Sequence, residues 1–202
     1  MRNQFEEALH FRHACKLFDE AKKIAPDDLR FILEAGRLSP SSFGMEPWEF
    51  WVVQDGKHKE ALRPLCWNQP QITTCSDLVV LLSRRNMRST NPYVAEQFKP
   101  RGALYEKYLQ TYHDFIDWRS DETIDCWSGK QVYLASGFIM LAAASIGIDS
   151  CPIEGFDKEK VEALLEVDTQ QFQIEYLIAL GYRVDEQPKR YRRDFDDVVR
   201  FL

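Results

Sequence analysis

Apolar residues spaced three and four positions apart predict several helices along this chain of 202 residues. Asn3 is a candidate cap for the first of them, and Pro26 followed by two acidic residues is a start signal for the second. That second helix is expected to end near Pro40, because proline does not continue a helix. The predicted helices cover residues 4–9, about 26–39, 57–66, 123–147 and 158–166.

Three further segments have the pattern of strands. Residues 48–54 alternate Trp48, Phe50 and Val52 with other side chains, which predicts a mostly buried strand. Residues 78–83 form a continuous apolar run of the fully buried type, and a third strand is expected over residues 172–179. Few strands and many helices favour a two-layer or three-layer arrangement around a small sheet.

The stretch 131–148 contains no charged residue and has 18 positions, the minimum for a membrane span. Gln131, Ser136 and Ser145 lie within it, and no second apolar stretch of this length accompanies it. These features favour a buried helix of a soluble protein. We therefore expect no membrane association.

The segment 93–127 is polar but rich in aromatic residues. Tyr105, Tyr108, Tyr112 and Phe115 step by three and four positions and so form one helical stripe. Such a stripe packs against a core or a second subunit, or it forms a mobile aromatic cover over a planar ligand. The sequence leaves both interpretations open.

Composition and charge narrow the class of protein. Apolar residues make up 45% and charged residues 29%, typical of a folded domain. Asp and Glu number 32 against 26 Lys and Arg, and a net charge of -6 argues against nucleic acid as the main partner. The five cysteines are scattered without a CxxC pair, which predicts neither a disulfide framework nor a metal site. An acidic N-terminal segment without an apolar core favours a cytoplasmic protein.

Two basic clusters stand out against this acidic background. The first contains Arg12, His13 and Lys16, and the second is Lys189-Arg190-Tyr191-Arg192-Arg193. Guanidinium groups bind phosphate through paired hydrogen bonds, so the two clusters together would form a phosphomonoester site. Such clusters are also common on solvated surfaces. Glycine-rich GxGxxG and P-loop patterns are absent.

Six motifs in order resemble the FMN-dependent nitroreductase family, and most closely the oxygen-insensitive NAD(P)H nitroreductases of bacteria. The motifs cover the chain from residue 12 to residue 199, and they are RHxxKxFD, SPSSFGxEPW, WNQxQI, GKQxYxA, GIDSCPIEGF and a terminal RxRR followed by acidic residues and Val-Val. The resemblance implies an α+β fold with a small mixed or antiparallel sheet flanked by helices, in an intertwined homodimer. It implies a single domain over residues 1–202 with a basic arm over about 183–202.

The resemblance also implies a set of FMN-binding residues. Arg12 would lie at the phosphate or ribityl end and Lys16 near the pyrimidine edge, whereas Pro40, Ser41 and Ser42 would reach a flavin bound mainly by the other subunit. Glu154 and Gly155 would offer backbone N–H groups to flavin N5 and O4, without an obligatory catalytic side chain. Gly44 stands where many relatives have Asn, Gln71 replaces a lysine of part of the family, and Arg190 replaces a usual lysine. The full set is Arg12, His13, Ala14, Lys16, Pro40, Ser41, Ser42, Gly44, Asn68, Gln71, Ile153, Glu154, Gly155, Arg190 and Arg192, with no metal.

The activity implied by the resemblance is a ping-pong reaction. NADH or NADPH would reduce FMN, which would pass two electrons to a nitroaromatic or a quinone. The sequence leaves open another electron-poor acceptor, such as a pteridine or an activated alkene. It also leaves open a flavin-binding redox sensor without turnover.

Overall fold

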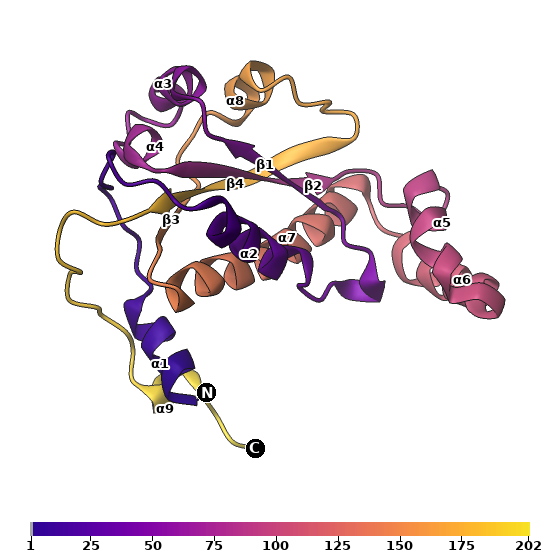
Figure 1. The fold of residues 1–202 in the computed structure, drawn as a ribbon. Coiled ribbons are helices and arrows are strands. Elements are labelled where there is room, and N and C mark those ends of the chain that lie inside the picture. Colours follow the sequence, from indigo (N-terminus) through magenta and orange to yellow (C-terminus); the bar gives the residue numbers. More distant parts are fainter. Residues whose placement is uncertain (1) are drawn as a thin grey trace.

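The computed structural model describes residues 2–202, and a four-stranded sheet lies at its centre (Figure 1). The strand order is β1-β2-β4-β3, and every neighbouring pair is antiparallel, so the sheet is antiparallel rather than mixed. The strands are β1 (Trp48–Val53), β2 (Asp77–Arg84), β3 (Asp149–Ile153) and β4 (Phe172–Gly181). Strand β3 is the one that the hydrophobic pattern does not predict.

Helices cover both faces of the sheet, which confirms an α+β architecture (Figure 1). Helices α3, α4 and α8 lie on one face, and α2 and α7 lie on the other. Their bounds, with those of the remaining helices, are α1 (Arg2–Phe11), α2 (Pro26–Arg37), η1 (Ser42–Gly44), α3 (Gly56–Leu65), α4 (Gln71–Thr74), α5 (Pro92–Phe98), η2 (Lys99–Leu104), α6 (Tyr105–Ile116), α7 (Asp121–Ser145), α8 (Lys158–Leu164) and α9 (Phe195–Val198).

The continuous apolar run of β2 explains how one strand supplies two cores. Successive side chains of a strand point to opposite faces. Accordingly, Leu78, Val80 and Leu82 pack against α3 and α8, whereas Val79 and Leu81 pack against α2 and α7 on the opposite face. The expected buried strand over residues 78–83 is therefore confirmed.

Strand β1 is less buried than its alternating pattern predicts. Only Trp48 is buried, and the other five residues are partly exposed. The reason is position, because β1 is an edge strand with a neighbour on one side only. The expected cap Asn3 is also wrong, since α1 already includes Arg2.

The aromatic stripe of α6 packs into a separate cluster beyond the end of the sheet. Tyr112 is fully buried there, and Tyr105, Tyr108 and Phe115 are partly buried against it. Phe43, which precedes β1, contacts this cluster with its ring centroid 5.3 Å from that of Tyr112. These contacts agree with the packing interpretation of the stripe.

The long apolar stretch forms most of α7, which runs beneath the sheet. Gly36 of α2 allows α7 to approach closely, because an added Cβ would lie 2.6 Å from Ile139. Among residues 2–202, no helix is both long enough and apolar enough to cross a membrane.

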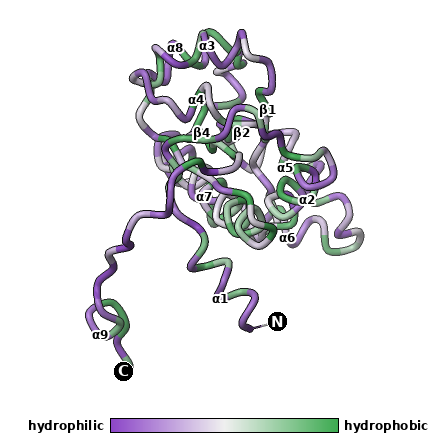
Figure 2. Tube along the Cα trace, turned by 60° about the vertical axis from the view of Figure 1, so that its left-hand side comes forward, coloured by the Kyte–Doolittle hydropathy of each residue, from purple (hydrophilic) through white to green (hydrophobic). Residues whose placement is uncertain are grey.

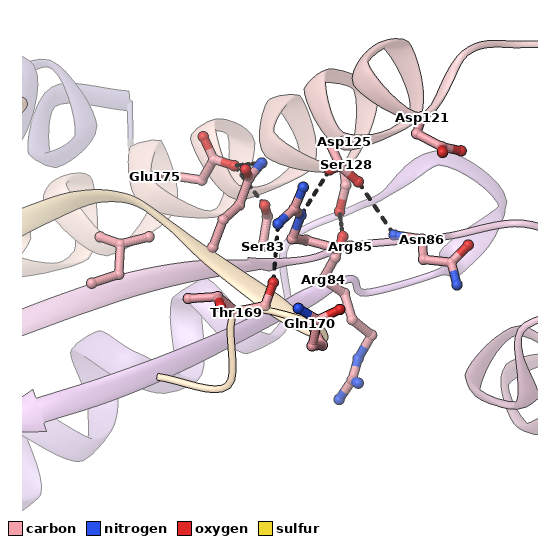
Figure 3. Close-up of polar contacts among 12 residues, drawn as sticks. Ser83, Arg84, Arg85, Asn86, Asp121, Asp125, Ser128, Thr169, Gln170 and Glu175 are labelled. Carbon is pink, nitrogen blue, oxygen red and sulfur yellow. Dashed lines mark hydrogen bonds and ion pairs between the residues drawn. The ribbon is translucent and has the colours of Figure 1, made fainter. Parts of the chain in front are cut away.

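A polar network joins the end of β2 to the start of α7 (Figure 3). The Asp125 carboxylate accepts from Arg85 Nε at 2.9 Å and from the Asn86 backbone N–H at 3.2 Å. Ser128 Oγ donates to the Arg84 carbonyl at 2.6 Å. The network fixes the point at which the chain leaves the sheet for the 93–127 segment.

Removing the central carboxylate with Asp125→Ala is expected to lower the free energy of unfolding by about 1–2 kcal/mol, because the partly exposed Arg85 guanidinium and the Asn86 backbone N–H lose their acceptor. The Asp125 side chain is 13% exposed. Asp121→Ala is the matched control, since that carboxylate is 79% exposed and pairs with Arg88 at the surface. The control should change stability by less than about 1 kcal/mol. Urea unfolding at one fixed protein concentration measures the stability of both variants. Equal losses of stability would contradict the central role of Asp125 in this network.

The C-terminal segment 183–202 leaves the sheet and projects from the same side of the molecule as α1 (Figures 1 and 2). Arg190 attaches this arm to the end of α1, because its guanidinium donates to the carbonyls of Leu9 at 2.7 Å and His10 at 3.1 Å. Backbone carbonyls at a helix C-terminus are favourable partners for a cation.

Candidate functional site

The candidate site lies along the free edge of β3. The Cys15 backbone N–H donates to the Ser150 carbonyl at 3.1 Å, and Ala14 and Ser150 form an isolated parallel bridge. Residues 12–16 therefore run beside β3 on the side away from β4. Because backbone groups alternate in direction along a strand, Pro152 also faces this free edge, where its missing N–H leaves no gap in the ladder.

Arg12, Arg190 and Arg192 lie close together at one end of this edge. Arg190 also donates to the Arg12 carbonyl. Partial burial lowers the pKa of Arg12, and the positive charges of Arg190 and Arg192 lower it further. Three cations that repel one another in an acidic chain form a strong attractor for an anion.

His13 and Ala14 lie between the two ends of the site. The His13 ring faces Asp149, with Nδ1 3.5 Å from Oδ1, and burial together with the charge of Arg183 lowers the pKa of His13. This side chain therefore points into the fold, whereas Ala14 is exposed. Both residues would reach a ligand mainly through their backbone.

Lys16 and Gln71 meet at Cys151 of β3. Lys16 Nζ lies 3.4 Å from Cys151 Sγ, and Gln71 Nε2 lies 3.8 Å from the same sulfur. Burial raises the pKa of Cys151, although the Lys16 charge opposes that effect. Gln71 is only 1% exposed, so it does not point into solvent.

Ile153, Glu154 and Gly155 form the end of β3 and the turn after it. Trp67 packs over this turn, and a Cβ on Gly155 would lie 2.7 Å from its ring. Trp67 and Asn68 both have positive φ values, of 54° and 55°, which reverse the chain after α3. Asn68 is thereby brought, exposed, to the same side of the site.

The Pro40–Gly44 loop lies elsewhere in this chain. It precedes β1, at the opposite edge of the sheet from β3, and is held by Ser42 N–H donating to Gln131 Oε1 at 2.9 Å. Ser41 Oγ accepts from the Glu46 backbone N–H at 2.8 Å. Three strand spacings separate the two edges, about 14 Å. Within one chain the loop does not join the other predicted residues.

Sequence reasoning missed three residues that contact the predicted set. Cys151 contacts Lys16 and Gln71, Gln69 donates to the Gly155 carbonyl at 2.8 Å, and Tyr133 donates to Glu154 Oε1 at 2.8 Å. Cys151, Gln69 and Tyr133 all lie within the quoted motifs, but no local pattern shows what their side chains reach.

The assembled edge thus has cations at one end and an ammonium, an amide and backbone N–H groups at the other. In residues 2–202 neither the Glu154 nor the Gly155 N–H donates to a protein acceptor. This arrangement suits an elongated ligand with a phosphate at one end and a polar ring edge at the other.

Comparisons with known proteins show similarity over nearly the whole chain. The chain is 39% identical over 218 residues to a Bacillus subtilis protein provisionally named NAD(P)H nitroreductase YfkO, with 100% of this chain and 99% of that protein covered. The fold is similar to a Staphylococcus epidermidis protein provisionally described as an NAD(P)H:FMN oxidoreductase, with a TM-score of 0.80, 29% identity and 98% and 95% coverage. It is also similar to an Exiguobacterium sibiricum protein, provisionally described as a nitroreductase and solved in complex with FMN, with a TM-score of 0.86, 22% identity and 98% and 97% coverage. The model of the nitroreductase family matches residues 9–182, and the chain belongs to this family.

Proposed function

We propose that this protein is an FMN-dependent NAD(P)H oxidoreductase that reduces nitroaromatics or quinones by two electrons in a ping-pong reaction. The observation that carries the proposal is the set of donors along one edge of β3, with Arg12, Arg190 and Arg192 at one end and Lys16 and Gln71 at the other. The names of the similar proteins support the same assignment.

The residues present fit FMN. Arg12, Arg190 and Arg192 would hold the phosphate, and their mutual repulsion would be relieved by that anion. Lys16 and Gln71 would lie at the pyrimidine edge, with Asn68 at the ring edge. The N–H groups of Glu154 and Gly155, which have no protein acceptor, would face N5 and O4.

When bound, FMN supplies a group that accepts a hydride from NADH or NADPH and returns two electrons to an acceptor. The protein's part is to hold the phosphate, to orient the ring through backbone donors and to place a positive charge beside its pyrimidine edge. No side chain has to act as an acid or a base in this scheme. Reductant and acceptor would use one open face in turn.

The site would be completed in a homodimer. The Pro40–Gly44 loop is remote from the β3 edge of its own chain, so the loop of a second copy would supply the contacts expected of Pro40, Ser41, Ser42 and Gly44. Leu134 and Phe138 of α7 are 50% and 45% exposed, and Phe5 of α1 is 54% exposed. An apolar face of this kind favours association with a second copy.

Steady-state kinetics test the proposed activity. Rates measured over several NADPH and quinone concentrations should give parallel double-reciprocal lines, as a ping-pong reaction requires. The same assay with NADH, a nitroaromatic, a pteridine and an activated alkene identifies the preferred pair. FMN-loaded protein that turns over none of these acceptors would favour a redox sensor, and intersecting lines would contradict the shared open face.

A further inference from the structure

The Glu154–Gly155 turn is the part of the site where backbone direction matters most. Ser150 faces the free edge of β3, because its carbonyl accepts from Cys15. Alternation places Pro152 on the same side, and Glu154 and Gly155 follow directly after the end of β3 at Ile153. A short turn that presents N–H groups to a ligand must be held by contacts of its own.

Gln69 holds this turn from the side of α3. Its Nε2 donates to the Gly155 carbonyl at 2.8 Å and to the Cys66 carbonyl at 3.0 Å. Its Oε1 accepts from Gln71 Nε2 at 2.9 Å. Gln69 therefore links the turn to Gln71, at the other end of the proposed ring site.

Tyr133 holds the same turn from the side of α7. Its hydroxyl donates to Glu154 Oε1 at 2.8 Å, and its ring packs on Tyr176 of β4 with 4.6 Å between centroids. Burial and the neighbouring Glu154 carboxylate raise the pKa of Tyr133, which keeps the hydroxyl protonated as a donor. The contact between the two rings fixes where that hydroxyl lies.

We propose that Gln69 and Tyr133 are positioning residues, which together fix the Glu154–Gly155 N–H groups against flavin N5 and O4. This inference rests on the proposed function. Flavin N5 accepts a hydrogen bond only in the oxidised cofactor, since N5 carries a hydrogen when reduced. Loosening the turn therefore weakens the binding of oxidised FMN more than that of reduced FMN.

The test compares Gln69→Met and Tyr133→Phe with the parent. Gln69→Met removes the amide at similar length, and Tyr133→Phe keeps the ring that packs on Tyr176 and removes only the hydroxyl. The dissociation constant for oxidised FMN should rise about tenfold for Gln69→Met and about threefold for Tyr133→Phe, with a smaller rise for reduced FMN. A tenfold preferential loss of oxidised FMN corresponds to a midpoint potential higher by about 30 mV.

Two matched controls carry the same chemical changes away from the site. Gln110→Met alters an exposed glutamine of α6, and Tyr112→Phe removes a buried hydroxyl that donates to the Met87 carbonyl at 2.6 Å. Tyr112→Phe should lower the urea midpoint, but neither control should change the FMN dissociation constants or the potential. Gln69→Glu keeps the size of the side chain but loses its N–H donors. This variant replaces Gln69→Met in the test if Gln69→Met does not fold.

The outcomes separate this inference from the proposed function. If the parent binds FMN tightly and both variants bind oxidised FMN within twofold of the parent, the positioning roles are wrong and the proposed function stands. Equal losses for oxidised and reduced FMN would also overturn these roles, since a general loss of structure would act on both. A parent chain that does not bind FMN would overturn both proposals.

Discussion

Replacing Arg192 by glutamate is expected to weaken FMN binding by up to about a thousandfold. A carboxylate about 4 Å from a phosphate, at an effective dielectric constant of about 20, costs up to about 4 kcal/mol. The charge of Arg192 already acts on Arg12, whose pKa it lowers. Because Arg192 is exposed, solvent screening should reduce the effect below this upper bound.

Arg193→Glu is the matched control for this variant. It makes the same charge change one position along the arm, but the Arg193 guanidinium is directed to Asp197, with Nη2 2.9 Å from that residue's carbonyl. Equilibrium dialysis with FMN should show a large loss for Arg192→Glu and little change for Arg193→Glu. Similar losses in both variants would mean that the arm acts through its overall charge. No loss in either variant would contradict the role of Arg192 in holding the phosphate.

Arg190 is less suited to a clean test, because its guanidinium also attaches the arm to α1. Arg190→Glu would place a carboxylate against the carbonyls of Leu9, His10 and Arg12. That variant should therefore detach the arm as well as weaken FMN binding.

Replacing Lys16 by methionine is expected to lower the midpoint potential of the bound flavin by a few tens of millivolts. Reduced flavin carries more negative charge at its pyrimidine edge than oxidised flavin, so a cation there stabilises the reduced form. A unit charge about 5 Å away at an effective dielectric constant of about 20 contributes at most about 3 kcal/mol. For a two-electron couple, about 1.4 kcal/mol corresponds to about 30 mV, and solvent screening of the exposed Lys16 reduces the shift.

A dye-equilibration titration measures this potential, with Lys57→Met as the control at the distant start of α3. The complementary variant Gln71→Lys adds a cation and should raise the potential. The rise in potential is limited, because Gln71 is 1% exposed and an ammonium group at this position must lose its hydrating water. An unchanged or higher potential in Lys16→Met would place Lys16 away from the ring.

The parts of the fold that could be predicted are those whose signal is local. The run of five apolar residues in β2 and the long uncharged stretch of α7 each predict their element directly. Strand β3 has no such signal, because it is five residues long and contains Pro152. Its place at the sheet edge, where that proline is tolerated, depends on pairing with β4 and not on its own residues.

The candidate site also has one part that local sequence patterns predict and one part that they do not. Some site residues are close in the sequence: Arg12 and Lys16 are four positions apart, and Glu154 and Gly155 are adjacent. The family resemblance identifies each of these pairs from one short motif. The contacts of Gln69 with Gly155 and of Gln71 with Cys151 join residues 86 and 80 positions apart. No periodicity or spacing encodes such contacts, so they require the folded chain.

The most direct test of the proposed function is anaerobic mixing of the purified, FMN-loaded protein with NADPH in the absence of an acceptor. The visible absorption of oxidised flavin should disappear rapidly and return when a quinone is added afterwards. This result would show that reductant and acceptor react in separate half-reactions on one flavin. The proposed function would be contradicted if the absorption disappeared only when NADPH and quinone were present together. It would also be contradicted if neither NADPH nor NADH caused any loss of absorption.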